Sequence, residues 1–321
     1  MGNELSTELA AIQDYFLDKA LEERSYDSPL LDMAQTPNIP QGRKDVAHFI
    51  RWGKLGYGED VAEGTDPATD ETMTQTEIKV ECTEISKAMK VIHYADKQRI
   101  LKVAEETYPK FKEQIVRSVN RRLTTALSAA NSTGNNSYSA ASFKYANGKT
   151  SFASLTTDDY FRETDIQEAI STLIENGHKG PYHVCLNPSS RRALFAKDAS
   201  FRDFQKQAGG GAMKSGKLGE WGGATIHLMH EPFREALGGT EGTRDDAGLV
   251  GSTYVWAEGD AYGVTKFGGM GGKGGGFMPT FFVNPYLTKT NAYFYIGYRL
   301  PVGAVTLDPT KIIAYKHYWN S

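Results

Sequence analysis

Two glycine-rich segments have the spacing of phosphate-binding loops. Gly211 to Lys217 (GAMKSGK) matches G-x-x-x-x-G-K, a pattern in which backbone amides and a lysine hold nucleotide phosphates. Leu218 stands where that loop needs a serine or threonine for magnesium. The preceding stretch, 201–208, is polar and does not have the apolar pattern of the strand that must lead into such a loop. We therefore expect a flexible loop here, not a nucleotide site.

The second glycine-rich segment, Gly269 to Gly274 (GMGGKG), matches G-x-G-x-x-G and follows a strand-like stretch. A dinucleotide site also needs a helix directly after the glycines, because the helix N-terminus holds the pyrophosphate. The chain continues instead with glycines and then Phe277-Met278-Pro279, which cannot begin such a helix. A flexible loop is expected here as well.

Metal ligands and nucleophiles are sparse in the sequence. His227 and His230 lie in ATIHLMH, which reads as a strand, so their side chains are expected on opposite faces of a sheet. Cys82 and Cys185 are far apart and are expected to be buried, reduced thiols. The sequence contains neither H-E-x-x-H nor G-x-S-x-G. We therefore expect no catalytic, cofactor-binding or metal site, and no enzymatic activity.

Composition and length set the class of protein. The 321 residues allow one large or two modest domains, and 40% hydrophobic with 23% charged residues is ordinary for a soluble protein. A net charge of −3 argues against a dedicated nucleic-acid binder. The N-terminus lacks the pattern of a signal peptide, and no apolar run approaches the ~18 residues of a membrane span. These features predict a protein made in the cytosol.

Residues 1–42 form an acidic segment, with eight acidic residues against Lys19 and Arg24. Apolar residues at helical spacing, among them Phe16, predict an amphipathic helix. Three prolines between residues 29 and 40 then favour an extended path. This combination predicts an arm that docks on another surface.

The next segment predicts a long two-stranded hairpin. Val46 to Tyr57 leads into an acidic stretch over 59–75 that contains Gly64 and Pro67, and the second strand includes Ile78 to Thr83. An isolated hairpin is only marginally stable in water, so one this long is expected to rest on another subunit or domain.

A long helix is predicted from Asp96 to about Asn131, with one apolar stripe at spacings of three and four and a kink or restart at Pro109. Between residues 97 and 122 it carries eight basic residues against three acidic ones. This basic face suits an acidic arm, and a merely solvated face is the alternative.

The remainder predicts a compact α+β domain followed by strands. Residues 131–157 read as a loop or junction, and Tyr182 to Leu186 reads as a strand after a helix. Asn187 and Pro188 predict the cap and first turn of another helix. From Gly251 onward the patterns are those of strands.

Four motifs resemble one known family in the same order. RWGKLGYGEDVAEGTDPATDETMTQTEIKVECTEISKAMKVIHYAD contains a turn, Glu63-Gly64-Thr65-Asp66-Pro67, and ends with Asp96 before the helix. The other three are YHVCLNPSSRRALFAKDASFRDFQ, GKLGEWGGATIHLM and GAVTLDPTKIIAYKHY. Together they resemble the major capsid proteins of tailed bacteriophages, the Hong Kong 97 (HK97) fold, from about residue 43 to the end.

This resemblance implies an α+β, HK97-like capsid fold. It implies an N-terminal arm over 1–42, an extended β-hairpin loop with peripheral-domain strands over 43–95, and a spine helix with a junction loop over 96–155. An axial domain over 156–285 and C-terminal strands over 286–321 that return to the peripheral domain complete the expected order. The chain would assemble into hexamers and pentamers of an icosahedral shell that encloses double-stranded DNA. Assembly would take place in the host cytoplasm, and the protein would end as part of the virion.

The same resemblance leads to expected contacts and partners. Subunit contacts are expected at Glu63, Gly64, Asp66 and Pro67 of the hairpin, at Phe16, Glu22 and Glu23 of the arm, and at Lys110, Lys112, Arg117 and Arg121 of the helix. Partners would be further copies of the chain, a separate scaffolding protein and a portal, with no cofactor and no membrane. Two alternatives stay open: an encapsulin-type shell that encloses protein cargo, and an α/β enzyme with an unrecognised site.

Overall fold

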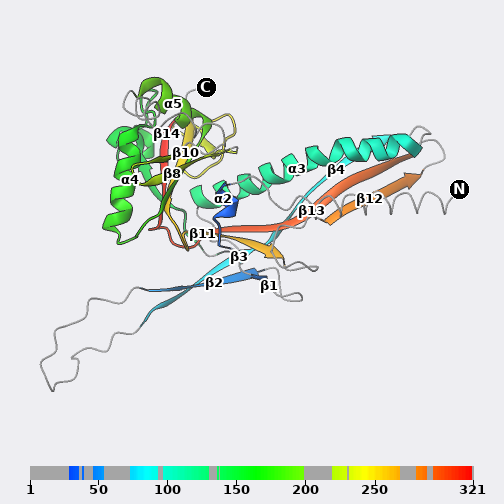
Figure 1. Ribbon diagram of the computed structural model, residues 1–321, viewed down its shortest axis with the longest axis horizontal. Coiled ribbons are helices and arrows are strands. Elements are labelled where there is room, and N and C mark those ends of the chain that lie inside the picture. The colour runs from blue at the N-terminus through cyan, green and yellow to red at the C-terminus, as the bar shows by residue number, and fades with distance from the viewer. Residues whose placement is uncertain are drawn as a thin grey trace, which may run out of the picture.

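The computed structural model describes residues 29–35, 38–39, 46–53, 73–92, 97–129, 136, 138–198, 219–229, 231–267, 280–287 and 292–319. Within these ranges the chain forms a long sheet with one helix along it and a second, more compact α/β body at one end (Figure 1). A two-stranded ribbon leaves the region where the two bodies meet. The predicted α+β content is confirmed.

The long sheet is built around one strand of 15 residues, β13 (Ala292–Thr306). The strand β4 (Thr83–Ile92) pairs with one side of it, and β12 (Thr280–Leu287) and β11 (Tyr262–Phe267) share the other side. The short β1 (Asn38–Ile39) lies parallel to β11. Alternate β13 residues are buried, as period-two burial of one sheet face requires: Ile296, Tyr298, Leu300 and Val302.

The helix α3 (Lys97–Ser128) lies along this sheet. Its predicted apolar stripe is buried from Phe111 to Ala126, and the Phe111 ring meets Tyr298 of β13 edge-on, with ring centroids 5.6 Å apart. The helix is continuous through Pro109, so a restart there, one of the two predicted outcomes, is wrong. Proline removes only one backbone hydrogen bond, whereas packing on the sheet holds the helix over several turns.

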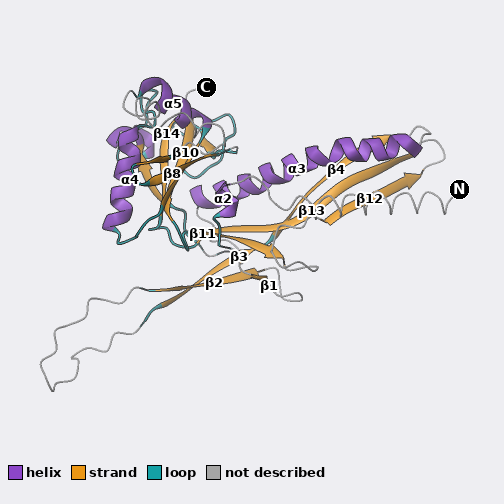
Figure 2. Cartoon of the chain, viewed as in Figure 1, coloured by secondary structure: helices purple, strands orange, loops and turns teal. Residues whose placement is uncertain are grey.

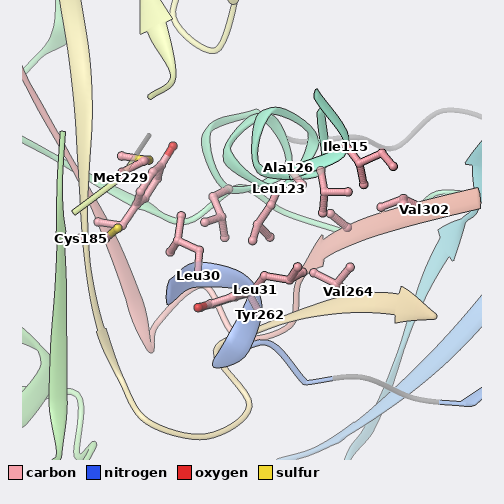
Figure 3. Packing of buried hydrophobic residues seen from close by; sticks show 14 of the residues in the cluster. Leu30, Leu31, Ile115, Leu123, Ala126, Cys185, Met229, Tyr262, Val264 and Val302 are labelled. Carbon is pink, nitrogen blue, oxygen red and sulfur yellow. The ribbon is translucent and has the colours of Figure 1, made fainter. Parts of the chain in front are cut away.

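Residues 29–35 and 38–39 belong to the folded body, although they were expected in an arm that docks on another surface. Leu30 and Leu31 of α2 (Pro29–Asp32) are buried beside Leu123 of α3 (Figure 3). The Gln35 amide donates to the Tyr262 carbonyl (3.0 Å), and the Gln35 carbonyl accepts from the Val264 amide (2.9 Å). The remainder of the expected arm, 1–28, lies outside the described residues.

The second body contains a seven-stranded mixed sheet covered by helices (Figure 2). The strand order is β5 (Ser142–Tyr145), β14 (Ile312–Tyr318), β10 (Val250–Ala257), β6 (Tyr182–Leu186), β8 (Ala224–Leu228) and β7 (Glu220–Trp221), with β9 (Arg234–Glu235) also pairing with β10. The helices are α4 (Glu163–Glu175), α5 (Pro188–Lys197) and the 3-10 turns Ala146–Gly148 and Phe152–Ser154. The predicted cap of α5 is confirmed, because Asn187 Oδ1 accepts from the Ser190 amide at 2.7 Å.

The two sheets do not follow the boundary expected between 285 and 286. Strand β11 precedes that boundary and pairs with β13, whereas β14 follows it and pairs with β10. Cys185, Tyr254 and Trp256 of the second sheet share one hydrophobic cluster with Leu123 of α3. Strand periodicity identifies a strand but not its sheet, so the sequence could not assign these strands.

The predicted hairpin is confirmed in its described part. Strands β2 (Val46–Trp52) and β3 (Gln75–Glu81) pair antiparallel, from Val46 opposite Glu81 to Trp52 opposite Gln75. Only Cys82 separates β3 from β4, so the ribbon continues directly into the long sheet. The turn with Glu63, Gly64, Asp66 and Pro67 lies outside the described residues.

Candidate functional site

The β2–β3 ribbon has one buried and one exposed face. On β2, Ala47 and Phe49 are buried, whereas Ile50 and Trp52 are 56% and 58% exposed. Met73, just before β3, is 48% exposed. A large apolar pair on a two-stranded ribbon is the kind of exposed surface that marks a contact with another protein.

The buried face fixes the ribbon to the body. Phe49 packs so closely on Gly263 of β11 that a Cβ there would lie 2.8 Å from the ring. Arg51 Nη2 lies 3.2 Å from Asp308 Oδ1 in the turn before β14. A cavity of about 710 Å³ lies at this attachment, and Trp52 and Lys311 are among its lining residues. The direction of the ribbon is therefore set by both bodies.

The basic residues predicted on α3 have different surroundings. Lys110 is exposed, and the side chain of Lys112 is not described. Arg117 pairs with Glu231, and Arg121 Nη1 lies 2.7 Å from Asp246 Oδ2. Two of the arginines expected to face an arm therefore contact acidic residues of the same chain. Their expected partners Phe16, Glu22 and Glu23 lie outside the described residues.

These acidic residues belong to a segment, 231–248, that we call the strap because it joins α3 to the second sheet. Arg244 anchors it on the helix side, where Nη1 donates to the Arg121 carbonyl and Thr124 Oγ1, both at 3.3 Å. Arg244 Nη2 also donates to the Pro232 carbonyl within the strap (3.1 Å). Local sequence patterns do not predict the strap, because its contacts with α3 join residues more than 100 positions apart.

The other side of the strap is held by a buried ion pair. Lys316 Nζ of β14 lies 2.7 Å from Glu235 Oε2 and 3.4 Å from Glu241 Oε1, and the Lys316 and Glu235 side chains are fully buried. Burial raises the pKa of the Glu235 carboxyl, and the Lys316 ammonium opposes that rise. The Lys316 ammonium also lies 4.2 Å from the centre of the Phe143 ring. The sequence did contain a signal that Lys316 is buried, because Ile312, Ala314 and Lys316 are alternate residues on the same face of one strand.

The histidines and cysteines form no recognisable reaction centre in the described part. His183 Nδ1 lies 3.3 Å from His227 Nε2, and both rings contact Trp256. Burial raises the pKa of the Cys185 thiol, and both cysteines are buried and form no disulfide, as predicted. No cluster of three or more potential ligands suited to a metal occurs among the described residues. His230 and the glycine-rich loops 209–216 and 268–276 lie outside them.

Within the described ranges, none of the helices combines the length and apolar character needed to cross a bilayer.

Comparisons with known proteins reveal the fold but no close relative. No family model matches the chain, and neither does any curated protein. The capsid of cyanophage Pam1 matches with a TM-score of 0.63 and 10% identity over 92% of each chain. The head of Helicobacter pylori bacteriophage KHP40 matches with 0.61 and 10% over 91% of this chain and 92% of that chain. The capsid of Ralstonia phage GP4 matches with 0.60 and 14% over 93% and 92%. The chain therefore has the fold of phage capsid proteins.

Proposed function

We propose that this chain is the major capsid protein of a tailed bacteriophage, a structural subunit without enzymatic activity. It assembles into hexamers and pentamers of an icosahedral shell. Further copies of itself are its main partners, and a separate scaffolding protein and a portal complete the shell. The shell encloses double-stranded DNA and is assembled in the host cytoplasm.

One observation carries this proposal: the ribbon has a buried face toward its own body, and its other face exposes two large apolar side chains, Ile50 and Trp52, beside charged ones. Phe49 is 6% exposed and Trp52 is 58% exposed, although they belong to the same short strand. Full burial of a large apolar side chain stabilises by about 1.5–3 kcal/mol. The isolated subunit does not gain this free energy from Ile50 and Trp52, because both remain exposed to water. A neighbouring subunit that covers this face would recover that free energy in each copy of the contact.

The parts of the fold take roles in this proposal. The long sheet with α3 is the peripheral domain and its spine helix, and the β2–β3 ribbon is the extended loop that lies across a neighbour. The body around β10 and β14 is the axial domain, in which the glycine-rich loop 209–216 lets one chain fit pentamers and hexamers. The glycine-rich loop 268–276 was also expected there, but in the chain it follows β11 and precedes β12, which both belong to the long sheet. The arm, reduced to residues before α2, reaches another subunit through Phe16, Glu22 and Glu23.

The charge of the chain supports a genome as cargo. With a net charge of −3, the chain has no overall basic excess that would bind packaged DNA to the wall. The compared solved structures are phage capsids, and a further match at 11% identity is the capsid of a GTA particle. These likenesses favour a phage shell over the encapsulin alternative.

Expression of the full chain, alone and with its neighbouring genes, tests the proposal. Negative-stain electron microscopy and sedimentation are expected to find shells, tubes or capsomer rings. Shells purified from a co-expression that includes packaging genes are expected to contain nucleic acid, read from the ratio of absorbance at 260 and 280 nm. A stable monomer or dimer under every condition contradicts the proposal, and shells filled with a specific protein favour the encapsulin alternative.

A further inference from the structure

A single arginine on α3 differs in its partners from its neighbours on the helix. Arg122 lies where β3 continues into β4, and its Nη1 donates to the carbonyls of Thr83 (3.1 Å) and Val302 (2.8 Å) and to Thr83 Oγ1. All three acceptors are neutral. Arg117 and Arg121, by contrast, each contact a carboxylate.

The Nε–Nη2 edge of the Arg122 guanidinium is suited to bind a carboxylate. Within the part of the chain that the structure describes, Nε and Nη2 of Arg122 make no hydrogen bond and no carboxylate contacts the group. The Nε–Nη2 edge of a guanidinium presents two parallel N–H groups at the spacing of the two oxygens of a carboxylate. The Nη1 contacts thus fix the orientation of Arg122. They leave its Nε–Nη2 edge, the one suited to a carboxylate, without a contact among the described residues.

Arg122 lines a cavity large enough for a side chain from elsewhere. The cavity has a volume of about 510 Å³ and is bounded by α3, the junction between β3 and β4, and β13. Arg121, Ser118, Thr125 and Tyr138 also line it. Its single acidic lining residue is Glu81, against two arginines. Arg121 is already paired with Asp246, so the guanidinium of Arg122 is the cation in this cavity that no carboxylate of the described residues contacts.

Burial makes a carboxylate partner more favourable at this position than at the surface. Burial lowers the pKa of the Arg122 guanidinium, yet arginine stays protonated in proteins. A partly buried cation with only neutral acceptors keeps part of its desolvation cost, and an incoming carboxylate offsets it. Solvent also screens a pair inside a cavity less than one on the exposed face of the helix.

The hairpin turn of another copy is the occupant that the charges favour. Residues 59–72 (EDVAEGTDPATDET) contain six carboxylates and no basic residue. Residues 1–28, the other acidic candidate, include Lys19 and Arg24. The β3 strand separates Gln75, at the outer end of the ribbon, from Cys82 beside Arg122, and seven residues of strand span roughly 23 Å. The outer end of the described ribbon, at Gln75, therefore lies far from its own cavity.

We propose that the cavity around Arg122 binds an acidic side chain from residues 59–72 of a neighbouring copy. This inference rests on the proposed function, because it names the receptor on one subunit for the hairpin of the next. Each copy then offers one acidic turn and one cavity, so the contact closes around a ring of subunits.

A charge exchange between full-length chains tests the contact. Arg122→Glu is expected to lower the yield of shells at least tenfold, and so is a second chain with Glu63→Lys, Asp66→Lys and Asp70→Lys. A 1:1 mixture of the two is expected to restore hexameric rings that contain both chains, because alternation around a six-membered ring gives each receptor a turn of opposite charge. A control, Arg191→Glu, reverses the charge of an exposed arginine on α5 and is expected to leave this exchange unaffected.

A disulfide trap covers the possibility that Arg122→Glu fails to fold. Ser118→Cys in one chain and Asp66→Cys in another change small parts of the two surfaces. After mixing, assembly and oxidation, a covalent dimer of the two different chains is expected on a non-reducing gel, and neither chain alone is expected to form it.

The outcomes separate this inference from the proposed function. Normal shells from Arg122→Glu, no rescue by the mixture, or a Ser118→Cys chain that crosslinks instead to a cysteine within residues 1–28 each overturn the inference and leave the capsid function standing. Absence of any assembly by the unaltered chain overturns both.

Discussion

Lys316 Nζ lies 2.7 Å from Glu235 Oε2, although neither side chain has any exposed surface. The pair joins β14, near the end of the chain, to β9 at the start of the strap. Glu235 also accepts a hydrogen bond from the Gly242 amide (2.5 Å), and Glu241 accepts one from the Tyr145 hydroxyl (3.0 Å). Because these groups lie inside the second body, they link the strap to the sheet and offer no open reaction site.

Removing one partner of this pair is expected to destabilise the subunit strongly. Lys316→Met leaves Glu235 buried without its counter-charge, at a cost of about 3–5 kcal/mol in the free energy of unfolding. The double variant Lys316→Met/Glu235→Leu is expected to recover most of that loss, because it leaves no unpaired buried charge. Urea unfolding of the unassembled chain, followed by circular dichroism, measures both. Equal losses in the single and double variants would contradict this account.

The two faces of β2 are expected to respond differently to truncation. Phe49→Ala empties a buried site against Gly263 and is expected to cost about 3–5 kcal/mol of stability. Trp52→Ala, three residues further on, is expected to change stability by less than about 0.5 kcal/mol. It is expected nevertheless to reduce the yield of shells. Thermal unfolding and particle counting on the same preparations separate the two effects, and full assembly by Trp52→Ala would remove this face from the mechanism.

The strap is expected to depend on Arg244 more than on the ion pairs of the helix surface. Arg244→Ala removes hydrogen bonds to the Arg121 and Pro232 carbonyls, at a cost of about 1.5–3 kcal/mol. Arg121→Ala breaks a pair whose side chains are 52% and 55% exposed, so its expected cost is at most about 1 kcal/mol. Hydrogen exchange over residues 231–248 reports both, and faster exchange is expected only in Arg244→Ala.

Two buried groups, His317 and Asp165, are expected to change the stability of the subunit in opposite directions as the pH falls. Burial lowers the pKa of His317 to about 4, and the hydrogen bond that Nδ1 donates to the Tyr318 carbonyl only partly opposes this shift. The unfolded chain therefore binds the proton first, and stability falls by about 1.4 kcal/mol per pH unit from about pH 6.5 to 4. Burial raises the pKa of Asp165 to about 6, so its contribution grows as the pH falls through the window from about 6 to 3.8.

Single variants separate the contributions of His317 and Asp165 to the slope of stability against pH. His317→Gln is expected to become more stable as the pH falls from 6 to 4, because the opposing His317 contribution is removed and the Asp165 contribution is kept. Asp165→Asn keeps an acceptor for the Arg162 amide and is expected to lose stability over the same window. Denaturant unfolding at half-unit pH steps measures the slopes, and parallel curves for the two variants would show that other groups dominate.

The position of an N-terminal truncation is expected to decide whether the subunit folds. Deletion of residues 1–28 leaves Leu30 and Leu31 in the core and is expected to give a folded chain that assembles poorly. Deletion of 1–42 also removes both leucines, which are 2% and 8% exposed, and the contacts of Gln35 with β11. That chain is expected to lose about 4–8 kcal/mol, on the scale of two truncated core leucines, and to unfold at lower temperature. Equal melting temperatures would place residues 29–39 outside the core.

Local patterns in the sequence were enough to determine the elements. The apolar stripe from Phe111 to Ala126 identified α3, Asn187 and Pro188 identified the start of α5, and alternation identified β3, because each depends on neighbours a few positions apart. The order of four short motifs pointed to a capsid fold, which the solved structures then matched.

Only the tertiary structure decided how these elements meet. Whether β14 joins β10 or β13 depends on pairing between distant strands, which alternation does not encode. The burial of Lys316 against Glu235, the packing of Leu30 and Leu31 and the path through Pro109 follow from contacts across the chain. The charge on Arg117 and Arg122 is the same in the sequence. Their different surroundings, a carboxylate for one and neutral carbonyls for the other, are set by which segments the fold brings to each turn of the helix.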